Sequence, residues 1–465
     1  MRECITILNG QAGLQIGDIC WDVFADEHGI NLDGSKSTKK IRNDNELLDT
    51  LFNETSRESH YVPRSIMVDN DPSVIDQILR SEKGQFYSSR MAIKGLEDAA
   101  NNFSRGFYTV SDRVLESTMD CIRKSMELCE SFQGFLMFSS FGGGTGSGLT
   151  ARLIDELEKY YNKKNRLEFN VFPSSQMSTA IVEPYNALFR AHTSLFYSSP
   201  MFLFDNEACF RLCQNELSVD RPHYYHINQL ISQVASSITA STRFGGQLNV
   251  DLAEFETNLV PFPRMHFLGS SYSPLLNREK SFCQNLSTKE MTRRCFESKN
   301  QMIEYKPSDG KYISCCLLYR GNVTPKDVFS SVNDIKSNRR EPIEFVKWSP
   351  TGMKTGISME PPSMLGDLAS VDRALCLCAN NTALVKCWEL LNSKVNKMYR
   401  KRAFVHWYVA EGMEELEFQE AIEDIDFLIQ DYKELEMTGE IDESRYKTAS
   451  NEDFSLIHNG FKPNA

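Results

Sequence analysis

The sequence predicts an α/β fold with a parallel β-sheet, followed by a helical region toward the carboxyl end. Three observations predict it. Short apolar runs alternate with amphipathic segments over about the first two hundred residues, glycine-rich turns follow two of these runs, and strand-like runs give way to helical patterns after about Asn381. Strands that alternate with helices are typical of βαβ units, whose strands lie parallel. Because 465 residues exceed one ordinary core, we expect two or three packed domains.

The elements are expected in the following order. Five apolar runs predict the strands of the first domain: Cys4–Leu8, Ser65–Val68, Gly134–Phe138, Leu167–Phe172 and Met201–Phe204. From about Asn206 to Cys378, longer helices and proline-bearing loops predict a second α/β domain. Its expected strands are Cys315–Tyr319 and Ile343–Trp348. Helical patterns then continue to the acidic region near the end of the chain.

Charge and cysteine content narrow the function classes. A net charge of -12 opposes non-specific attraction to nucleic acid or to an anionic membrane surface, so we expect neither as a partner. The thirteen cysteines show neither a disulfide-like nor a metal-like spacing, which suits a reducing cytosol. No apolar run reaches about 18 residues and the amino end lacks the core of a signal peptide. We therefore expect a soluble protein of the cytoplasm, without membrane insertion.

The acidic charge is concentrated in one segment. Between Glu411 and Glu443 there are fourteen acidic residues and one base, Lys433. Apolar side chains recur there at helical spacing, which predicts a helix that docks by one stripe: Leu416, Ile422, Ile425 and Ile429. Two interpretations stay open for the acidic face. It is either a solvated surface or a docking strip for basic partners.

Two glycine-rich segments follow predicted strands and precede helical patterns. They are Gly10–Gly17 and Gly142–Gly148. A strand, a glycine turn and a helix amino end gather backbone N–H groups around one point, where the helix dipole favours an anion such as phosphate. Neither segment ends in the Gly-Lys-Ser/Thr of a Walker loop, so backbone and metal would meet the phosphate charge. Gln11 and Gln15 share one helix face and could reach a phosphate or a metal-bound water.

The alternatives to phosphate binding differ between the two segments. For Gly10–Gly17, a tight turn that merely needs small residues remains open. Five glycines with a threonine and a serine in Gly142–Gly148 would destabilise a purely structural turn, which favours a ligand there. Asp69 and Asp71, after a predicted strand, could hold hydrated Mg²⁺. A dinucleotide oxidoreductase is disfavoured, because the first turn reads G-x-x-G-x-x-x-G rather than G-x-G-x-x-G.

At "FGGGTGSGLT" the second glycine segment resembles the tubulin signature. Other segments resemble tubulin in the same order and cover nearly the whole chain, among them "GQAGLQIG", "GLEDAANNFSRGFYT", "STAIVEPYNA", "NVDLAEFETNLVPFPR" and "KRAFVHWYVAEGMEE". The chain is similar to an α-subunit in three respects: it begins "MREC", it has Glu254 where β-chains have Lys, and it has a long loop before "GDLA". The resemblance implies a Rossmann-like GTP-binding domain over 1–205, an intermediate α/β domain over 206–380, a helical hairpin region over 381–440 and a flexible tail over 441–465.

The resemblance also implies a GTP and Mg²⁺ site. Phosphate contacts are expected from Gln11, Asn101 and the glycine run, guanine contacts from Asn206, Tyr224 and Asn228, and a ribose contact from Glu183. Asp69 and Asp71 are the expected metal residues, and Glu254 is the expected catalytic residue. The full set of implied nucleotide contacts is Gln11, Asp98, Ala99, Asn101, Ser140, Gly143, Gly144, Thr145, Gly146, Thr179, Glu183, Asn206, Tyr224 and Asn228.

The implied function is an α-tubulin-like subunit of cytoplasmic microtubules. It would pair with β-tubulin, polymerise head to tail, and use Glu254 to orient the water that attacks GTP on the adjacent β subunit. Basic microtubule-associated proteins and motors are the other expected partners. The alternative is a divergent tubulin-like protein that binds nucleotide and β-tubulin but caps or specialises filaments.

The chain departs from α-chains at several positions, of which Cys283 and the Glu341–Pro342 insertion motivate that alternative. Asp71 stands where α-chains usually have Glu, and Cys283 stands where they usually have His. A Glu-Pro pair is inserted at Glu341 and Pro342, and the tail ends in Ala465 instead of Tyr. Lys40 occupies the position of the acetylated lysine of α-chains, within different flanking residues.

Overall fold

The computed structural model describes residues 3–37, 45–55, 60–278, 286–337, 343–349, 352–366 and 368–439. Some of the expectations fall outside these ranges. They concern Lys40, Cys283, the Glu341–Pro342 insertion and the tail over 441–465.

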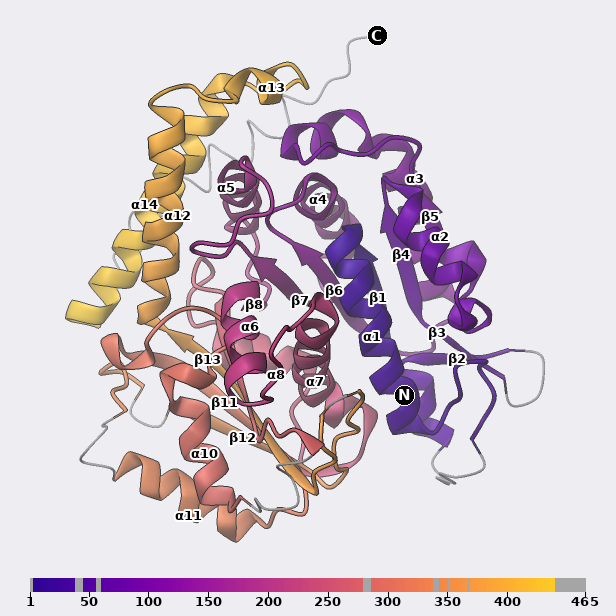
Figure 1. Ribbon diagram of the computed structural model, residues 1–465, viewed down its shortest axis with the longest axis vertical. Coiled ribbons are helices and arrows are strands. Elements are labelled where there is room, and N and C mark those ends of the chain that lie inside the picture. The colour runs from indigo at the N-terminus through magenta and orange to yellow at the C-terminus, as the bar shows by residue number, and fades with distance from the viewer. Residues whose placement is uncertain are drawn as a thin grey trace.

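The first half of the chain forms the parallel part of one large sheet (Figure 1). Its strands lie in the order β5-β4-β1-β6-β7-β8. Their bounds are β1 (Glu3–Asn9), β4 (Ser65–Asp69), β5 (Ala92–Lys94), β6 (Phe132–Ser140), β7 (Asn165–Phe172) and β8 (Met201–Asp205). Each neighbouring pair in this series is parallel. The five strands expected in this half are confirmed, because each predicted run lies within one of β1, β4, β6, β7 and β8.

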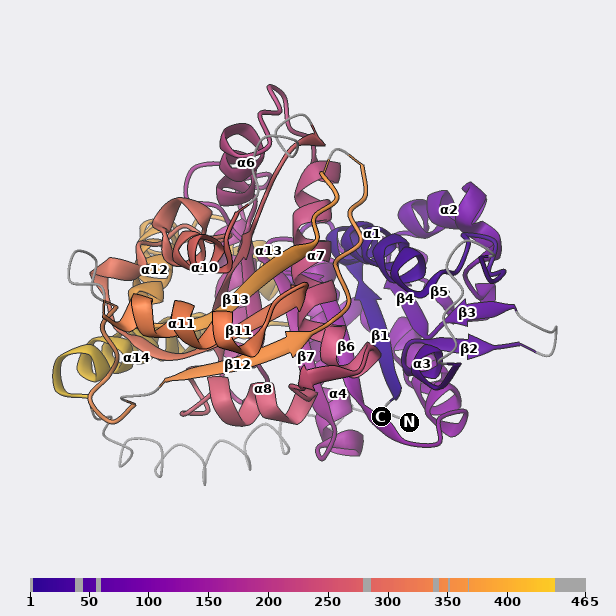
Figure 2. The same ribbon diagram turned by 90° about the horizontal axis from the view of Figure 1, so that it is seen from below.

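The second half extends the same sheet. Its strands are β9 (Gly246–Leu248), β10 (Phe267–Ser273), β11 (Tyr312–Gly321), β12 (Met353–Ser358) and β13 (Arg373–Asn381). In the first half, β2 (Phe52–Glu54) and β3 (Tyr61–Pro63) form a separate two-stranded sheet. Strand β10 is parallel to β8 and antiparallel to β13, which in turn pairs with β11. In the view of Figure 2, helix α7 (Tyr224–Arg243) stands between β1 and β4 on one side and β11 to β13 on the other.

The strand expected over Cys315–Tyr319 is confirmed within β11, whereas the strand expected over Ile343–Trp348 is wrong. In that run only Phe345 forms a bridge, to Tyr312 at the start of β11. The edge of β11 further along is already paired with β12 from Cys315 onward. The apolar run therefore meets one end of a strand whose remaining hydrogen bonds are taken.

Helices cover both faces of the sheet. Their bounds, besides α7, are α1 (Gly10–His28), α2 (Pro72–Arg80), α3 (Ser111–Glu127), α4 (Thr150–Tyr161), α5 (Glu183–Ser194), α6 (Asn206–Asn215), α8 (Leu252–Leu259), α10 (Thr288–Phe296), α11 (Pro325–Lys336), α12 (Val385–Tyr399), α13 (Val405–Val409) and α14 (Glu415–Thr438). Strand β1 shows how alternation divides the core. Leu8 packs in the cluster with α1 and α7, whereas Ile5 and Ile7 pack in the cluster with α3 and α4. Among the described helices, none is long and apolar enough to cross a membrane.

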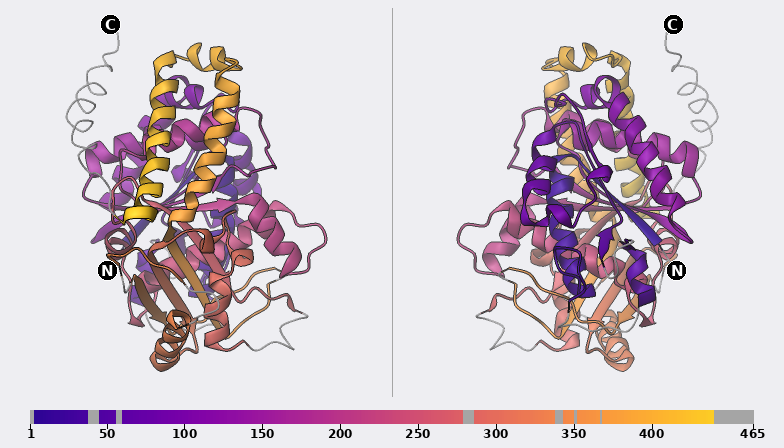
Figure 3. Two further views of the ribbon diagram at one scale, coloured as in Figure 1. Left: turned by 90° about the vertical axis from the view of Figure 1, so that its left-hand side faces the viewer. Right: turned by 90° about the vertical axis from the view of Figure 1, so that its right-hand side faces the viewer.

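The carboxyl-terminal helices α12 and α14 form a hairpin, which Figure 3 shows from its outer side. Along α14, Ile425 and Ile429 are buried and Ile422 is partly buried, as their spacing predicts. The expectation for Leu416 is wrong, because its side chain is 62% exposed. Phe418, two residues later, is fully buried in its place and packs against Phe189 of α5.

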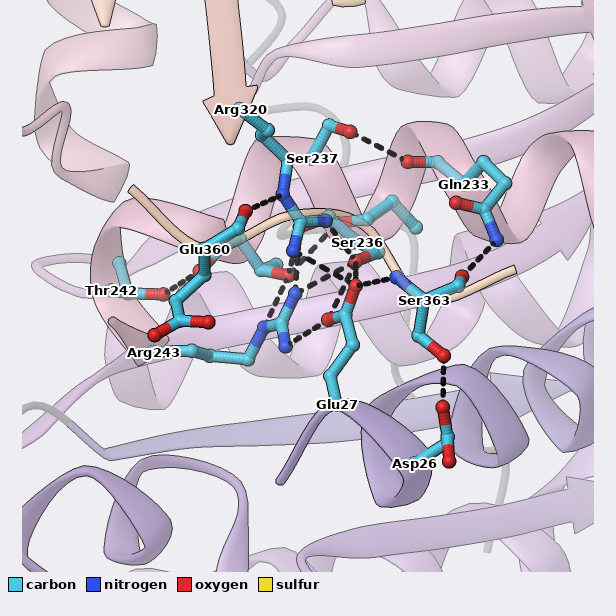
Figure 4. A network of polar contacts seen from close by, with 12 residues as sticks. Asp26, Glu27, Gln233, Ser236, Ser237, Thr242, Arg243, Arg320, Glu360 and Ser363 are labelled. Atoms are coloured by element: carbon cyan, nitrogen blue, oxygen red, sulfur yellow. Dashed lines mark hydrogen bonds and ion pairs between the residues drawn. The ribbon is translucent and has the colours of Figure 1, made fainter. Parts of the chain in front are cut away.

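A buried ionic network joins the two halves of the chain (Figure 4). The carboxylate of Glu27 in α1 lies 2.5 Å from Arg243 at the end of α7 and 2.9 Å from Arg320 of β11. The Ser236 hydroxyl donates to the same carboxylate at 2.8 Å. Burial alone would raise the pKa of Glu27, but Arg320 and Arg243 hold it at about 2. The network therefore fixes α1, α7 and β11 to one another through charge.

Candidate functional site

Both glycine-rich segments lie at the carboxyl edge of the parallel strands. Helix α1 begins at Gly10, directly after β1, and the second segment follows β6. Gly10 has a φ of 69°, and a Cβ atom there would lie 2.9 Å from the backbone nitrogen of Gly146. Only glycine tolerates this combination of left-handed backbone and close approach. The two segments are therefore in direct contact, although more than a hundred residues separate them.

The first segment is a helix and not a loop, which corrects the expectation for Gly10–Gly17. Its second and third glycines allow α1 to pack closely on the sheet. A Cβ atom at Gly13 would collide with the Phe138 carbonyl, and one at Gly17 would collide with the Leu8 side chain. The interpretation that small residues are needed for packing holds for these two positions. Gln11 and Gln15 are exposed on the opposite face of α1 from the core.

The second segment combines a bend with a helical turn. Residues 141–143 form the bend, Gly144 is already helical, and the π-helical turn η5 (Thr145–Leu149) leads into α4. A Cβ atom at Gly144 would lie 2.9 Å from the Ala99 methyl group, and one at Gly142 would lie 2.5 Å from a Glu183 carboxylate oxygen. Gly143 differs from both, because its Cβ would meet only the Ser140 hydroxyl, at 3.8 Å. The backbone at Gly143 therefore borders open space, beside a helix start whose first N–H groups lack intrahelical partners.

A third loop closes one side of this space. Ala100 and Asn101 have φ angles of 48° and 54°, in the left-handed region that non-glycine residues seldom adopt. The buried amide of Asn186, in α5, donates to the carbonyls of Asn101 and Gly142, at 2.8 Å each. The loop is thus tied to the glycine run. The side chains of Asp98 and Asn101 are exposed, whereas Ala99 is buried against Gly144.

Acidic and amide side chains lie at the end of β4. Asp69 is 3% exposed, and its burial raises the pKa of that carboxyl to about 7. Neither polar atom of the buried Asn70 amide has a hydrogen-bond partner among the described residues. Asp71 is differently engaged, because it caps α2: its two carboxylate oxygens accept from the Ser73 amide at 3.1 Å and from the Ser73 hydroxyl at 2.5 Å.

These residues fit a nucleotide-bound magnesium ion in part. Within the described ranges there is no closed group of three or more His, Cys, Asp or Glu side chains arranged for a metal. Mg²⁺ that accompanies a nucleotide needs only one or two carboxylates, because phosphates and waters fill its other positions. Asp69 and the unpartnered Asn70 suit that arrangement. Asp71 also caps α2, and each of its carboxylate oxygens keeps a lone pair beyond the hydrogen bond from Ser73.

The residues expected around the base lie on neighbouring helices. Asn206 begins α6, Tyr224 begins α7, and Asn228 follows one turn later with 7% exposure. Tyr224 is half exposed, and its ring lies 5.8 Å from that of Phe210 in α6. Because α7 also packs against α1, this group borders the helix that carries Gln11 and Gln15.

Two further residues expected to contact the nucleotide, Thr179 and Glu183, lie before α5 and at its start. Thr179 is exposed, and Glu183 begins α5 beside Gly142. Burial raises the pKa of Glu183, although the Ser178 hydroxyl donates to its carboxylate at 2.6 Å. Glu183 therefore lies beside the glycine run.

Glu254 does not belong to this group. It lies in the first turn of α8, which precedes β10, and β10 begins beside the start of the parallel strand β8. Helix α8 is thus at the amino edge of the sheet, opposite the glycine segments. The Glu254 carboxylate pairs with the Lys354 ammonium of β12 at 2.5 Å, and both side chains are about one-third exposed.

Two buried amides that organise the site are not among the residues predicted from the sequence. Asn186 is one, and Asn9 is the other: it ends β1 and donates from Nδ2 to the Thr150 hydroxyl at 2.7 Å. An asparagine inside an otherwise apolar run is the signal that could have indicated them, because a buried amide needs partners. The identity of those partners depends on contacts between distant segments.

Two family models match this chain. Residues 3–214 match the GTPase domain of the Tubulin/FtsZ family, and residues 263–393 match the tubulin C-terminal domain. Together the two matches span more than half of the chain. The first contains both glycine segments and Asp69, whereas Tyr224, Asn228 and Glu254 lie between the matched ranges.

Proposed function

Because this chain belongs to the tubulin family, we propose that it is an α-tubulin-like subunit of microtubules that binds GTP and pairs with β-tubulin. The convergence of the two glycine segments on the open backbone at Gly143 carries the proposal. The match to a GTPase domain supports binding and hydrolysis of GTP in general. The roles proposed for single residues rest on the resemblance to tubulin together with the position of each residue in the structure.

The phosphates would lie against Gly143, Gly144 and the first turn of η5. Free backbone N–H groups and the helix dipole favour anionic oxygens there. Gln11 and Asn101, both exposed, would donate to the phosphates from the two flanking elements. GTP would supply the phosphoanhydride bond that is cleaved, and Mg²⁺, held through Asp69 and water, would offset the phosphate charge.

The guanine base would lie between α6 and α7. The amides of Asn206 and Asn228 offer both donors and acceptors, and the half-exposed Tyr224 ring offers a face for stacking. A site whose buried amides pair with guanine would leave them unpaired with adenine, so it would reject ATP. Glu183 would accept from the ribose hydroxyls.

Glu254 would act on a nucleotide of the next subunit and not on that of its own chain. It lies at the amino edge of the sheet, whereas the glycine segments lie at the carboxyl edge. Head-to-tail stacking would bring one edge onto the other. Under this arrangement Glu254 orients the attacking water only after assembly, and Lys354 holds its carboxylate in the meantime.

The cytoplasmic microtubule is the proposed location, and the acidic surface of α14 is the proposed contact for basic microtubule-associated proteins and motors. Glu420, Glu423 and Asp426 are exposed along that helix while its apolar stripe is buried. Such a surface attracts basic partners and repels nucleic acid and anionic membranes. The alternative function, a tubulin-like cap, rests on the departures at Cys283 and at Glu341–Pro342, which lie outside the described residues.

Nucleotide extraction and copolymerisation test the proposal. We expect the purified full chain to release guanine nucleotide when it is denatured, and to enter microtubules with β-tubulin as seen by electron microscopy. Absence of nucleotide, or adenine nucleotide in its place, would contradict GTP binding. Binding of GTP and β-tubulin without incorporation along the filament would favour the capping alternative.

A further inference from the structure

The loop on the phosphate side of the candidate site is bonded to a segment some three hundred residues later. Asn102 donates from Nδ2 to the carbonyl of Trp407 at 3.0 Å. The Ser104 hydroxyl donates to the carbonyl of Tyr408 at 2.8 Å. Both acceptors belong to α13, which lies at the outer end of the carboxyl-terminal hairpin (Figure 1). Side chains of the loop therefore hold the backbone of α13.

Asn186 connects this contact to the glycine run. Its Nδ2 donates to the carbonyls of Asn101 and Gly142 at 2.8 Å each, and its Oδ1 accepts from the Phe103 amide at 3.0 Å and from the Tyr408 hydroxyl at 2.7 Å. An amide group can make four such bonds, so Asn186 has used its full capacity. It is also fully buried. Because the amide is planar, movement of either loop changes its geometry toward Tyr408.

We propose that Asn186 and Tyr408 are positioning residues that couple nucleotide occupancy at the glycine run to the conformation of α13. The inference rests on the proposed GTP site. A phosphate at Gly143 would fix the carbonyls that Asn186 contacts, and Tyr408 would transmit that constraint to its neighbours Trp407 and Val409, which are 60% and 43% exposed. Coupling of this kind is reciprocal: if bound nucleotide changes the conformation of α13, then the conformation of α13 changes the affinity for nucleotide. A change at Tyr408 should therefore alter nucleotide affinity.

The variant Y408F tests the coupling because it removes one hydroxyl and keeps the buried ring. We expect the full-length Y408F chain to bind GTP at least about fivefold more weakly than the wild type, the lower end of typical coupling between sites. The matched control is Y185F. The Tyr185 hydroxyl donates to the Ala403 carbonyl at 3.0 Å, and its buried ring packs edge-on against Tyr408 at 5.6 Å. We expect Y185F to bind GTP as the wild type does.

Amide hydrogen exchange gives a second readout that a general loss of packing would not produce. We expect GTP to slow exchange over both 99–104 and 405–411 in the wild type. In Y408F the slowing over 405–411 should be smaller but not absent, because Asn102 and Ser104 still donate to α13 carbonyls. Equal weakening of GTP binding in Y408F and Y185F, or no weakening in either, would overturn the inference while leaving the proposed function intact. Failure of the wild-type chain to bind GTP would overturn both.

Discussion

At the scale of single residues, the candidate site depends on where a side chain is absent. Three consecutive glycines have three different surroundings. Gly142 is covered by Glu183, Gly144 is covered by Ala99, and Gly143 borders open space. Only Gly143 has room for an added methyl group without a change in the protein. The methyl group would then lie where we place the phosphate.

The pair G143A and G144A separates ligand binding from packing. We expect G143A to fold with an unchanged melting temperature and to bind GTP roughly tenfold more weakly, or about 1.4 kcal/mol, because its methyl group occupies the phosphate space. G144A should destabilise the fold by about 1 to 3 kcal/mol, because its methyl group meets Ala99 and the Asn102 backbone. Thermal unfolding and GTP titration measure the two effects. Normal GTP binding by G143A would remove the glycine run from the site.

At the scale of elements, the sequence predicts five strands of the first half correctly, but it does not show which other apolar runs join the sheet. Runs such as Gly134–Phe138 carry a local signal, because a strand buried on both faces must be apolar throughout. Ile343–Trp348 carries the same signal but is not a strand, because the edge of β11 beside it is paired with β12. Leu416 fits the helical stripe of α14 but lies where the stripe leaves the core. Neither outcome can be read from the segment itself.

The candidate site shows the same division. The glycine run was recognisable because its composition is costly without a ligand. Gly13 and Gly17 belong to helix packing, and that role depends on Phe138 and Leu8 lying beneath them. Asp71 is predicted at the metal, and the structure shows that it also caps α2 through Ser73. Local chemistry thus indicated the kind of site, whereas tertiary contacts decide which residues are free to serve it.

The junction of α1, α7 and β11 predicts an acid sensitivity. The pKa of Glu27 is about 2 in the folded chain, below its ordinary value of 4.5, so its carboxylate stabilises the fold above about pH 4.5. That stability is lost as the pH falls from about 4.5 to about 2, and amounts to roughly 3 kcal/mol. We expect E27Q to lower the melting temperature at pH 7, because Arg243 and Arg320 lose their counter-charge.

Melting temperature as a function of pH measures this effect. The difference between the wild type and E27Q should shrink between pH 4.5 and pH 2, as protonation removes the charge from the wild type as well. The control is E420Q, which changes an exposed carboxyl of α14 and should melt as the wild type does at every pH. If the melting temperatures of the wild type and E27Q fell in the same way between pH 4.5 and pH 2, the Glu27 charge would not stabilise the junction.

At the scale of the whole molecule, the two edges of the sheet carry different chemistry. The glycine segments, Asp69 and the Asn101 loop gather at the carboxyl edge, and Glu254 lies at the amino edge. A single chain cannot bring these groups together without refolding its sheet. Two chains stacked head to tail can do so, because the amino edge of one then faces the carboxyl edge of the next. Hydrolysis that depends on Glu254 would for this reason depend on assembly.

The variant E254A tests this division of labour. A carboxylate that positions water contributes about 10²- to 10⁴-fold, or on the order of 3 to 5 kcal/mol of barrier. We therefore expect E254A to fold, pair with β-tubulin and assemble, but to release phosphate at least about 100-fold more slowly in the polymer. Unassembled subunits should hydrolyse GTP as slowly as the wild type, because no neighbouring nucleotide is within reach. The polymers should remain rich in GTP and disassemble slowly.

The control for this experiment is E256A, on the same helix. Glu256 is partly buried, and its carboxylate accepts a 3.4 Å hydrogen bond from the Ser198 hydroxyl. E256A removes the same charge from α8 without touching the Lys354 pair, so its polymers should release phosphate at the wild-type rate. If E254A and wild type released equal phosphate per assembled dimer, Glu254 would have no part in hydrolysis. The Glu254–Lys354 pair would then be a structural contact only.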